Sequence, residues 1–273
     1  MACRKAYRKT TKTTNNIPPI VNNDAETAAE NVAVKKVDRL FFGVNSKVRA
    51  DERLQNNLDE FEWATRNKLY PNFWGRNING DGALTRKEIE FLRDRACKIA
   101  PIYLNSEEKK TEEQGRHHAK QINVIADELG IPLGTAIFLE IKEDEPITRK
   151  YLLGFAKALF SCGYVPGFRA NTDAAYDFDC EYSRGMQTDP ELFGDCLIWA
   201  VAPSLAEYDR VTTTHLIHPD NWKPYAPSGI KRTDIAIWQY GKDCHPIDND
   251  DGIEVTFNID LVRDEEIIIK NMF

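Results

Sequence analysis

Three side chains, Glu140, Lys142 and Asp260, lie in short runs typical of strands and could carry acid–base or nucleophilic chemistry. Side chains alternate between the two faces of a strand. In the run 135–142 (TAIFLEIK) the aliphatic residues therefore share one face, and Glu140 and Lys142 share the other. Asp260 alternates with apolar residues in the run 253–261. Two carboxyl groups facing one space are what glycoside hydrolysis uses, so Glu140 and Asp260 are the catalytic candidates.

Polar and aromatic residues near the ends of similar runs could hold a sugar. Aromatic faces stack on sugar rings, and amide and charged groups bond to hydroxyl groups. We therefore expect substrate contacts from Asn45, Arg76, Tyr103, Lys142, Trp199, Trp238, Gln239 and Tyr240.

Glu140 and Lys142 could form a structural ion pair, or Glu140 could take part in catalysis, and both interpretations stay open. The nearby ammonium group favours the ionised form of Glu140, whereas a general acid must hold its proton. Glu140 would then serve as base or nucleophile. Glu143, Asp144 or Glu145 from the following loop could supply the acid.

The segment 77–88 (NINGDGALTRKE) has the spacing of a calcium-binding loop. Asn79 and Asp81 could supply oxygens, Gly82 the sharp turn and Glu88 the bidentate carboxylate. Asn77 replaces the usual first aspartate, and Pro71 and Gly75 interrupt the preceding stretch, so a turn between a strand and a helix is favoured over bound calcium. We expect no metal and no cofactor.

The elements that must position these residues alternate along the chain. Strands are predicted at 39–45, 72–78, 98–104, 135–141, 164–169, 196–202, 234–240 and 253–261, and helices at 52–67, 84–96, 111–129 and 147–162. Such alternation implies parallel strands with helical crossovers. The segment 203–233 is too rich in proline and turn residues for a helix.

Eight strands in this length favour an α/β fold of the TIM type, a (β/α) barrel with a β-rich, irregular last third. An open doubly wound sheet is the alternative, but the chain lacks a glycine-rich dinucleotide loop. Active sites of such barrels lie at the carboxyl ends of the strands. Glu140, Lys142 and Asp260 are expected at that mouth.

Charge divides the 273-residue chain, whose net charge is −7, into two regions. Residues 1–37 carry seven basic and three acidic residues, which predicts a flexible basic arm that could dock a protein partner. Residues 38–273 carry 29 basic and 40 acidic residues and are expected to form the barrel. The acidic balance argues against nucleic-acid binding. No apolar stretch is long enough for a membrane span. The first residues lack a secretory signal, which predicts synthesis for the cytoplasm or export by a non-classical route.

The motifs FFGVNS, NFWGRNI, LTRKEIEFLRDRACKIAPIY, GIPLGTAIFLEI, GYVPGF, LIWAVAPS and IAIWQYG…FNIDL occur in order. Over residues 38–264 the chain resembles the glycoside-hydrolase-like TIM-barrel domains of unknown function, relatives of the family 25 lysozymes. The resemblance implies a barrel that acts on or binds bacterial cell-wall glycan (peptidoglycan).

The resemblance also identifies a degraded carboxylate set. Family 25 lysozymes carry carboxylates on the first strand, as an Asp-x-Glu pair on a middle strand, and near the last strand. Here the first position is Asn45, the middle pair is Glu140 and Lys142, and only Asp260 matches. The alternative function is therefore a catalytically inactive barrel, serving as a glycan-binding or structural/cargo module of a phage-like assembly.

Overall fold

A computed structural model describes residues 39–105, 107–143, 145–205, 210–211, 217–246, 252–253 and 255–273. They belong to one compact unit, Val37–Phe273. The predicted arm over 1–37 and the candidate acid Asp144 lie outside the described residues. Among the described helices, none is long and apolar enough to cross a membrane.

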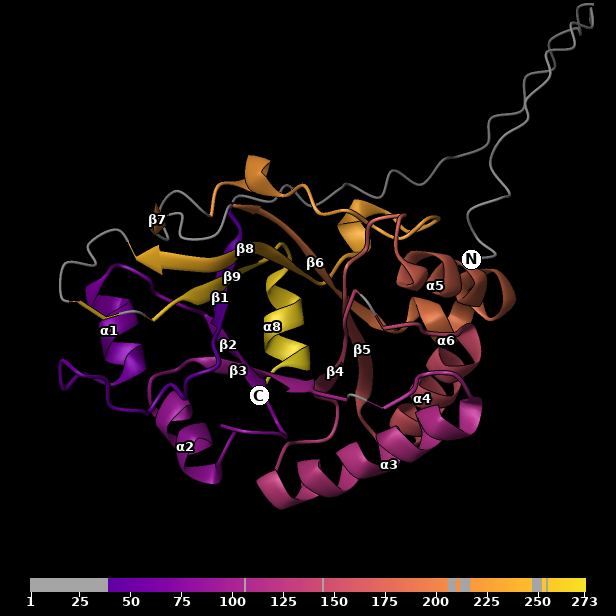
Figure 1. The fold of residues 1–273 in the computed structure, drawn as a ribbon, viewed down its shortest axis with the longest axis horizontal. Helices are drawn as coiled ribbons and strands as arrows, with labels where there is room; N and C mark the ends of the chain where they lie inside the picture. Colours follow the sequence, from indigo (N-terminus) through magenta and orange to yellow (C-terminus); the bar gives the residue numbers. More distant parts are fainter. Residues whose placement is uncertain are drawn as a thin grey trace, which may run out of the picture. The chain divides into compact units, whose positions relative to one another are not determined.

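Eight strands close into a ring in the order β1-β2-β3-β4-β5-β6-β8-β9 and back to β1 (Figure 1). Their bounds are β1 Phe41–Asn45, β2 Phe73–Asn77, β3 Lys98–Tyr103, β4 Ala136–Ile141, β5 Val165–Ala170, β6 Leu197–Leu205, β8 Ile237–Pro246 and β9 Phe257–Val262. A short strand, β7 (Arg210–Val211), pairs with the end of β8. Each of the eight ring strands overlaps a range predicted from the sequence.

The all-parallel arrangement expected of a TIM barrel is wrong for the last strand. β1 to β6 and β8 run parallel to their neighbours, whereas β9 is antiparallel to both β8 and β1. Only ten residues separate Pro246 from Phe257. A parallel connection needs about a dozen residues or more, usually with a helix. The ring is therefore closed by a hairpin, and its strands are mixed.

Helices surround the ring, namely α1 Glu60–Arg66, α2 Arg86–Asp94, α3 Glu112–Leu129, α4 Arg149–Ser161, α5 Asp177–Thr188, α6 Pro190–Gly194 and the 3₁₀ turns η2 Pro219–Asn221 and η3 Arg232–Asp234. Capping residues mark the ends of three of these helices. Thr85 and Thr148 accept hydrogen bonds from backbone groups of the first turns of α2 and α4. Gly130 ends α3 in the left-handed region.

The strands carry apolar side chains on both faces. Ile137, Leu139 and Ile141 of β4 pack in the outer layer against the helices, whereas Phe138 packs inside the barrel. The predicted facing of this strand is thus confirmed. Inside the barrel, a Cβ on Gly167 would lie 2.4 Å from the Phe138 ring, so glycine is required there to make room for it.

The helix α8 (Glu265–Asn271) covers the end of the barrel at which the parallel strands begin. Its Ile268 and the following Met272 join the interior cluster. Phe273 exchanges two backbone hydrogen bonds with Ile99 at the start of β3. With this end closed, access to the interior is left to the carboxyl ends of the strands.

Candidate functional site

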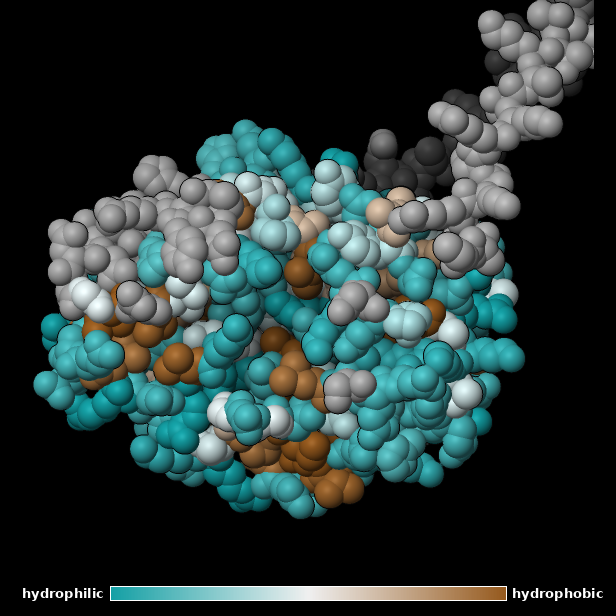
Figure 2. Space-filling model, in the orientation of Figure 1, coloured by the Kyte–Doolittle hydropathy of each residue, from teal (hydrophilic) through white to brown (hydrophobic). Residues whose placement is uncertain are grey.

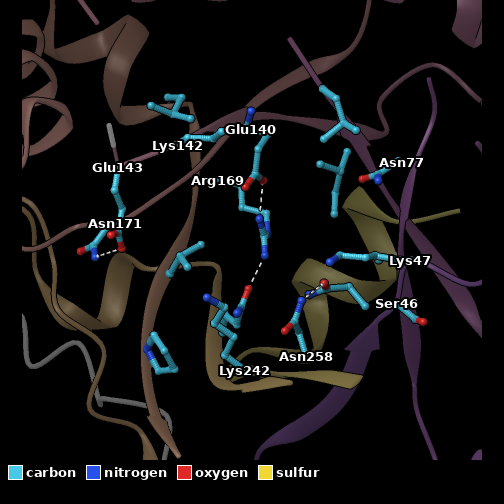
Figure 3. Close-up of a pocket in the computed structure, with 18 residues that line it drawn as sticks. Ser46, Lys47, Asn77, Glu140, Lys142, Glu143, Arg169, Asn171, Lys242 and Asn258 are labelled. Carbon is cyan, nitrogen blue, oxygen red and sulfur yellow. Dashed lines mark hydrogen bonds and ion pairs between the residues drawn. The ribbon is translucent and has the colours of Figure 1, made fainter. Parts of the chain in front are cut away.

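A cavity of about 610 Å³ opens at the carboxyl ends of the parallel strands (Figure 3). Figure 2 shows this face, with mainly hydrophilic side chains around its centre. The cavity is lined by Asn45, Ser46, Lys47, Gly75, Asn77, Ile102, Leu104, Glu140, Ile141, Lys142, Glu143, Arg169, Asn171, Val201, Pro203, Gln239, Lys242 and Asn258. Four predicted site residues are therefore brought together here, namely Asn45, Glu140, Lys142 and Gln239.

A chain of polar contacts crosses the cavity floor (Figure 3). Arg169, the inward residue near the end of β5, forms an ion pair with Glu140 through Nη1 and donates from Nη2 to Oε1 of Gln239. Its guanidinium carbon lies 5.3 Å from the centre of the Trp199 ring. Its Nε is buried without a hydrogen-bond partner among the described groups. Glu140 therefore has a cation of its own in the structure.

Sequence reasoning missed Arg169, although the signal was present. In the strand GYVPGFRA, Phe168 and Ala170 belong to the outer apolar layer. Strand alternation then sends Arg169 inward. The facing rule that was applied to β4 would have found it on β5.

Asp260 of β9 lies beneath this floor, with 0% of its surface exposed. Its Oδ2 accepts from Nδ2 of Asn45 at 2.7 Å, and its Oδ1 accepts from the Trp199 indole N–H at 2.9 Å. Burial raises the pKa of Asp260 to about 7, against the opposing effects of Arg169 and the two donors. Asp260 does not line the cavity.

Lys142 does not pair with Glu140, so the structural ion pair between them is absent. The exposed Lys142 ammonium lies 3.5 Å from Glu145, which also pairs with the buried Lys109 at 2.5 Å. Burial opposes ionisation of Glu145, but the two lysines outweigh it and lower its pKa. Glu143 accepts from the amide of Asn171 at 2.6 Å, and the two side chains lie next to each other at the cavity rim.

The aromatic candidates lie elsewhere, which corrects the expected stacking platform. Trp238 and Tyr240 face outward from β8 because Gln239 between them faces inward. Trp238 is buried and donates to the Ala202 carbonyl at 2.9 Å. Trp199 fills the barrel interior below the cavity. None of the described lining residues is aromatic.

Two further candidates are committed to structural contacts. The hydroxyl of Tyr103 donates to Gln121 of α3 at 2.8 Å. The side chain of Arg76 is 0% exposed, its Nε lies 2.7 Å from Glu88, and it also donates to the carbonyl of Gly82 at 2.6 Å. Neither Tyr103 nor Arg76 lines the cavity.

The same contacts reinterpret the calcium-like loop. Glu88, which would supply the bidentate ligand, is buried, accepts from the backbone N–H of Ala50 at 2.9 Å and pairs with Arg76. Asn79 bonds with both backbone groups of Leu104 at 2.8 Å. These side chains join loops to the barrel, and the segment forms the predicted turn between a strand, β2, and a helix, α2. Among the described residues, no three His, Cys, Asp or Glu side chains converge on a possible metal position.

Comparison with solved structures finds similar folds. An uncharacterized protein of B. stearothermophilus is 23% identical, with a TM-score of 0.69, over 85% of this chain and 100% of that one. The catalytic domain of the endolysin ply40 from bacteriophage P40 of Listeria monocytogenes is 12% identical, with a TM-score of 0.49, over 85% and 96%. The modular autolysin LytC from Streptococcus pneumoniae is 13% identical, with a TM-score of 0.48, over 81% and 46%.

Among curated proteins, none matches the sequence. The family described as the Rv2525c-like, glycoside hydrolase-like domain matches residues 69–252, which is more than half of the chain. That match and the closed α/β barrel agree with the resemblance found in the motifs. The chain belongs to the family of Rv2525c-like, glycoside hydrolase-like domains.

Proposed function

We propose that the protein binds a glycan at the mouth of its barrel, with bacterial peptidoglycan as the first candidate. The observation that carries the proposal is the cavity of about 610 Å³, placed where barrels of this kind hold their ligands and lined by amide and charged side chains. The family suggests the ligand class, because its domain is described as glycoside hydrolase-like. We also propose that the barrel is of the TIM type, although β9 runs antiparallel to its two neighbours.

The contacts of the carboxylates favour binding over hydrolysis. A glycosidase needs one carboxyl group as acid and another as base or nucleophile, both reaching the scissile bond. Glu140 is held by Arg169, and Asp260 has no exposed surface and both of its oxygens occupied. The pair therefore lacks the open arrangement that the chemistry needs.

Hydrolysis by Glu140 and Asp260 is the second candidate, because one observation favours it. A pKa of about 7 leaves Asp260 protonated to a large extent near neutral pH, as a general acid requires. This mechanism needs Arg169 to release Glu140 when substrate binds, so that Glu140 can act as base or nucleophile, and it needs the buried Asp260 to become accessible to the substrate.

Co-sedimentation with insoluble peptidoglycan, together with an assay for reducing ends, tests both candidates. We expect wild-type protein to sediment with peptidoglycan and to release no reducing ends. Release that the Glu140→Gln variant abolishes would instead establish the second candidate. Absence of both binding and release would overturn the proposal and would leave the alternative that the barrel serves as a structural module.

A matched pair of variants connects binding to the cavity. Asn77 lines the cavity, whereas Asn123 lies on the outer helix α3. Loss of one hydrogen bond costs about 1 kcal/mol, so Asn77→Ala should weaken binding about fivefold. Asn123→Ala should bind as the wild type does. Equal affinities for all three proteins would place the glycan elsewhere.

A further inference from the structure

The described cavity lining has a charge opposite to that of the chain. It contains the cations Lys47, Lys142, Arg169 and Lys242 against the carboxylates Glu140 and Glu143, whereas the whole chain has a net charge of −7. An acidic protein thus presents an excess of two positive charges at this mouth.

Ion pairs within the protein compensate only part of this charge. Arg169 is paired with Glu140, and Lys142 lies near Glu145. No carboxylate among the described residues lies within ion-pair distance of Lys47 or Lys242. Within the part of the chain that the structure describes, these two exposed ammonium groups are therefore the charges of the lining without an ion-pair partner.

The topology places the two lysines on one side of the cavity. Lys47 follows β1 and Lys242 lies in β8, and β9 runs between these strands. Asn258 of β9 pairs with Asn45 in the strand register and lies between the two lysines in Figure 3. Glu140 and Glu143 lie across the cavity. The positive side of the mouth is therefore separate from the Glu140–Arg169 pair.

A neutral sugar would fit this lining poorly. A ligand that covers the two lysines removes water from their ammonium groups. This desolvation is unfavourable unless the ligand offers the ammonium groups a charged or polar partner instead. A carboxylate or phosphate returns such a partner through charge-assisted hydrogen bonds. No aromatic residue of the described lining offers stacking in its place.

We propose that the ligand is an anionic glycan, whose carboxylate or phosphate group binds between Lys47 and Lys242. This inference rests on the proposed function and specifies its substrate class. Screening weakens the attraction, so affinity should fall as salt is raised from about 0.05 M to about 0.5 M.

Calorimetric titration of the full chain with matched oligosaccharides tests the inference. The probes are an oligogalacturonate, its neutral methyl ester, a phosphorylated oligosaccharide and its unphosphorylated parent. We expect each charged probe to bind at least about tenfold more tightly than its neutral partner, since two exposed charge contacts contribute a few-fold each. The stronger charged probe identifies the carboxylate or the phosphate as the preferred group.

Two double variants with the same change in net charge provide the control. Lys47→Gln/Lys242→Gln should lose about tenfold in affinity for the charged probe and little for the neutral one. Lys120→Gln/Lys223→Gln removes two exposed lysines that do not line the cavity and should bind as the wild type does.

The failures are distinguishable. Equal binding of charged and neutral probes, or equal losses in the two double variants, would overturn the anionic inference while leaving glycan binding intact. Failure to bind any probe, together with failure to sediment with peptidoglycan, would overturn the proposed function as well.

Discussion

The buried carboxyl of Asp260 should make the stability of the protein fall between acidic and neutral pH. Burial raises its pKa from an ordinary 3.8 to about 7 in the folded protein. Below the ordinary value the group is protonated in both the folded and the unfolded chain. As the pH rises toward 7, the unfolded chain loses this proton while the folded chain retains it, so the free energy of unfolding decreases.

The size of this effect follows from the shift. Three pKa units correspond to about 4 kcal/mol, which is lost progressively as the pH rises from about 4 to about 7 and then stays constant. Asp260→Asn removes the ionisation. The new amide also presents N–H groups to the donors of Asn45 or Trp199, at a cost of about 1–3 kcal/mol that does not depend on pH. The free energy of unfolding of the variant should therefore differ from that of the wild type both in its value and in its slope against pH.

Urea unfolding followed by tryptophan fluorescence, repeated from about pH 4 to about pH 8, measures the difference in slope. Asp127→Asn, an exposed change on α3, is the control and should follow the wild-type slope. NMR titration of the Asp260 carboxyl carbon gives the pKa directly. Parallel curves for wild type and Asp260→Asn would refute the reasoning, because they would mean that burial does not hold this proton.

Two further changes test contacts that support the barrel. Arg76→Met should lower the free energy of unfolding by about 3–5 kcal/mol, because it leaves the buried Glu88 carboxylate without its cation, and Arg76→Met/Glu88→Leu should recover much of the loss in urea unfolding. Gly154→Ala should lower the thermal midpoint, at a cost of about 1–3 kcal/mol, because its Cβ would lie 2.1 Å from the backbone oxygen of Glu112. As the control, the Cβ of Gly194→Ala would meet nothing within 4 Å, so this variant should be tolerated. Equal thermal midpoints for the two variants would contradict the close packing of α3 against α4.

The sequence predicted the elements that carry clear local signals. The alternation in the run 135–142 identified a strand that the structure confirms, and the helices α2 and α4 lie within the ranges predicted for them. The helix α5 was missed, and Tyr176 at its start makes no capping hydrogen bond through its side chain. The antiparallel β9 was missed because strand direction depends on the length of the connection, which local alternation does not report.

Only part of the candidate site was predicted. Glu140 and Gln239 line the cavity, whereas Trp238 faces outward because neighbouring residues of a strand alternate. The inward position of Arg169 follows from the same alternation along β5. That Glu140 pairs with Arg169 rather than with Lys142 depends on how neighbouring strands align, and a single sequence does not show this register.

The hairpin that closes the ring also sets an order of events during synthesis. Asn45 and Asp260 are hydrogen-bonded although 215 positions separate them. As the chain leaves the ribosome, β2 to β6 can each pair with the strand made just before, but one edge of β1 stays open until residues 257–262 have emerged. An open edge can pair with other chains. The growing polypeptide therefore stays vulnerable to misassociation until late in translation, and its cavity exists only once the ring has closed.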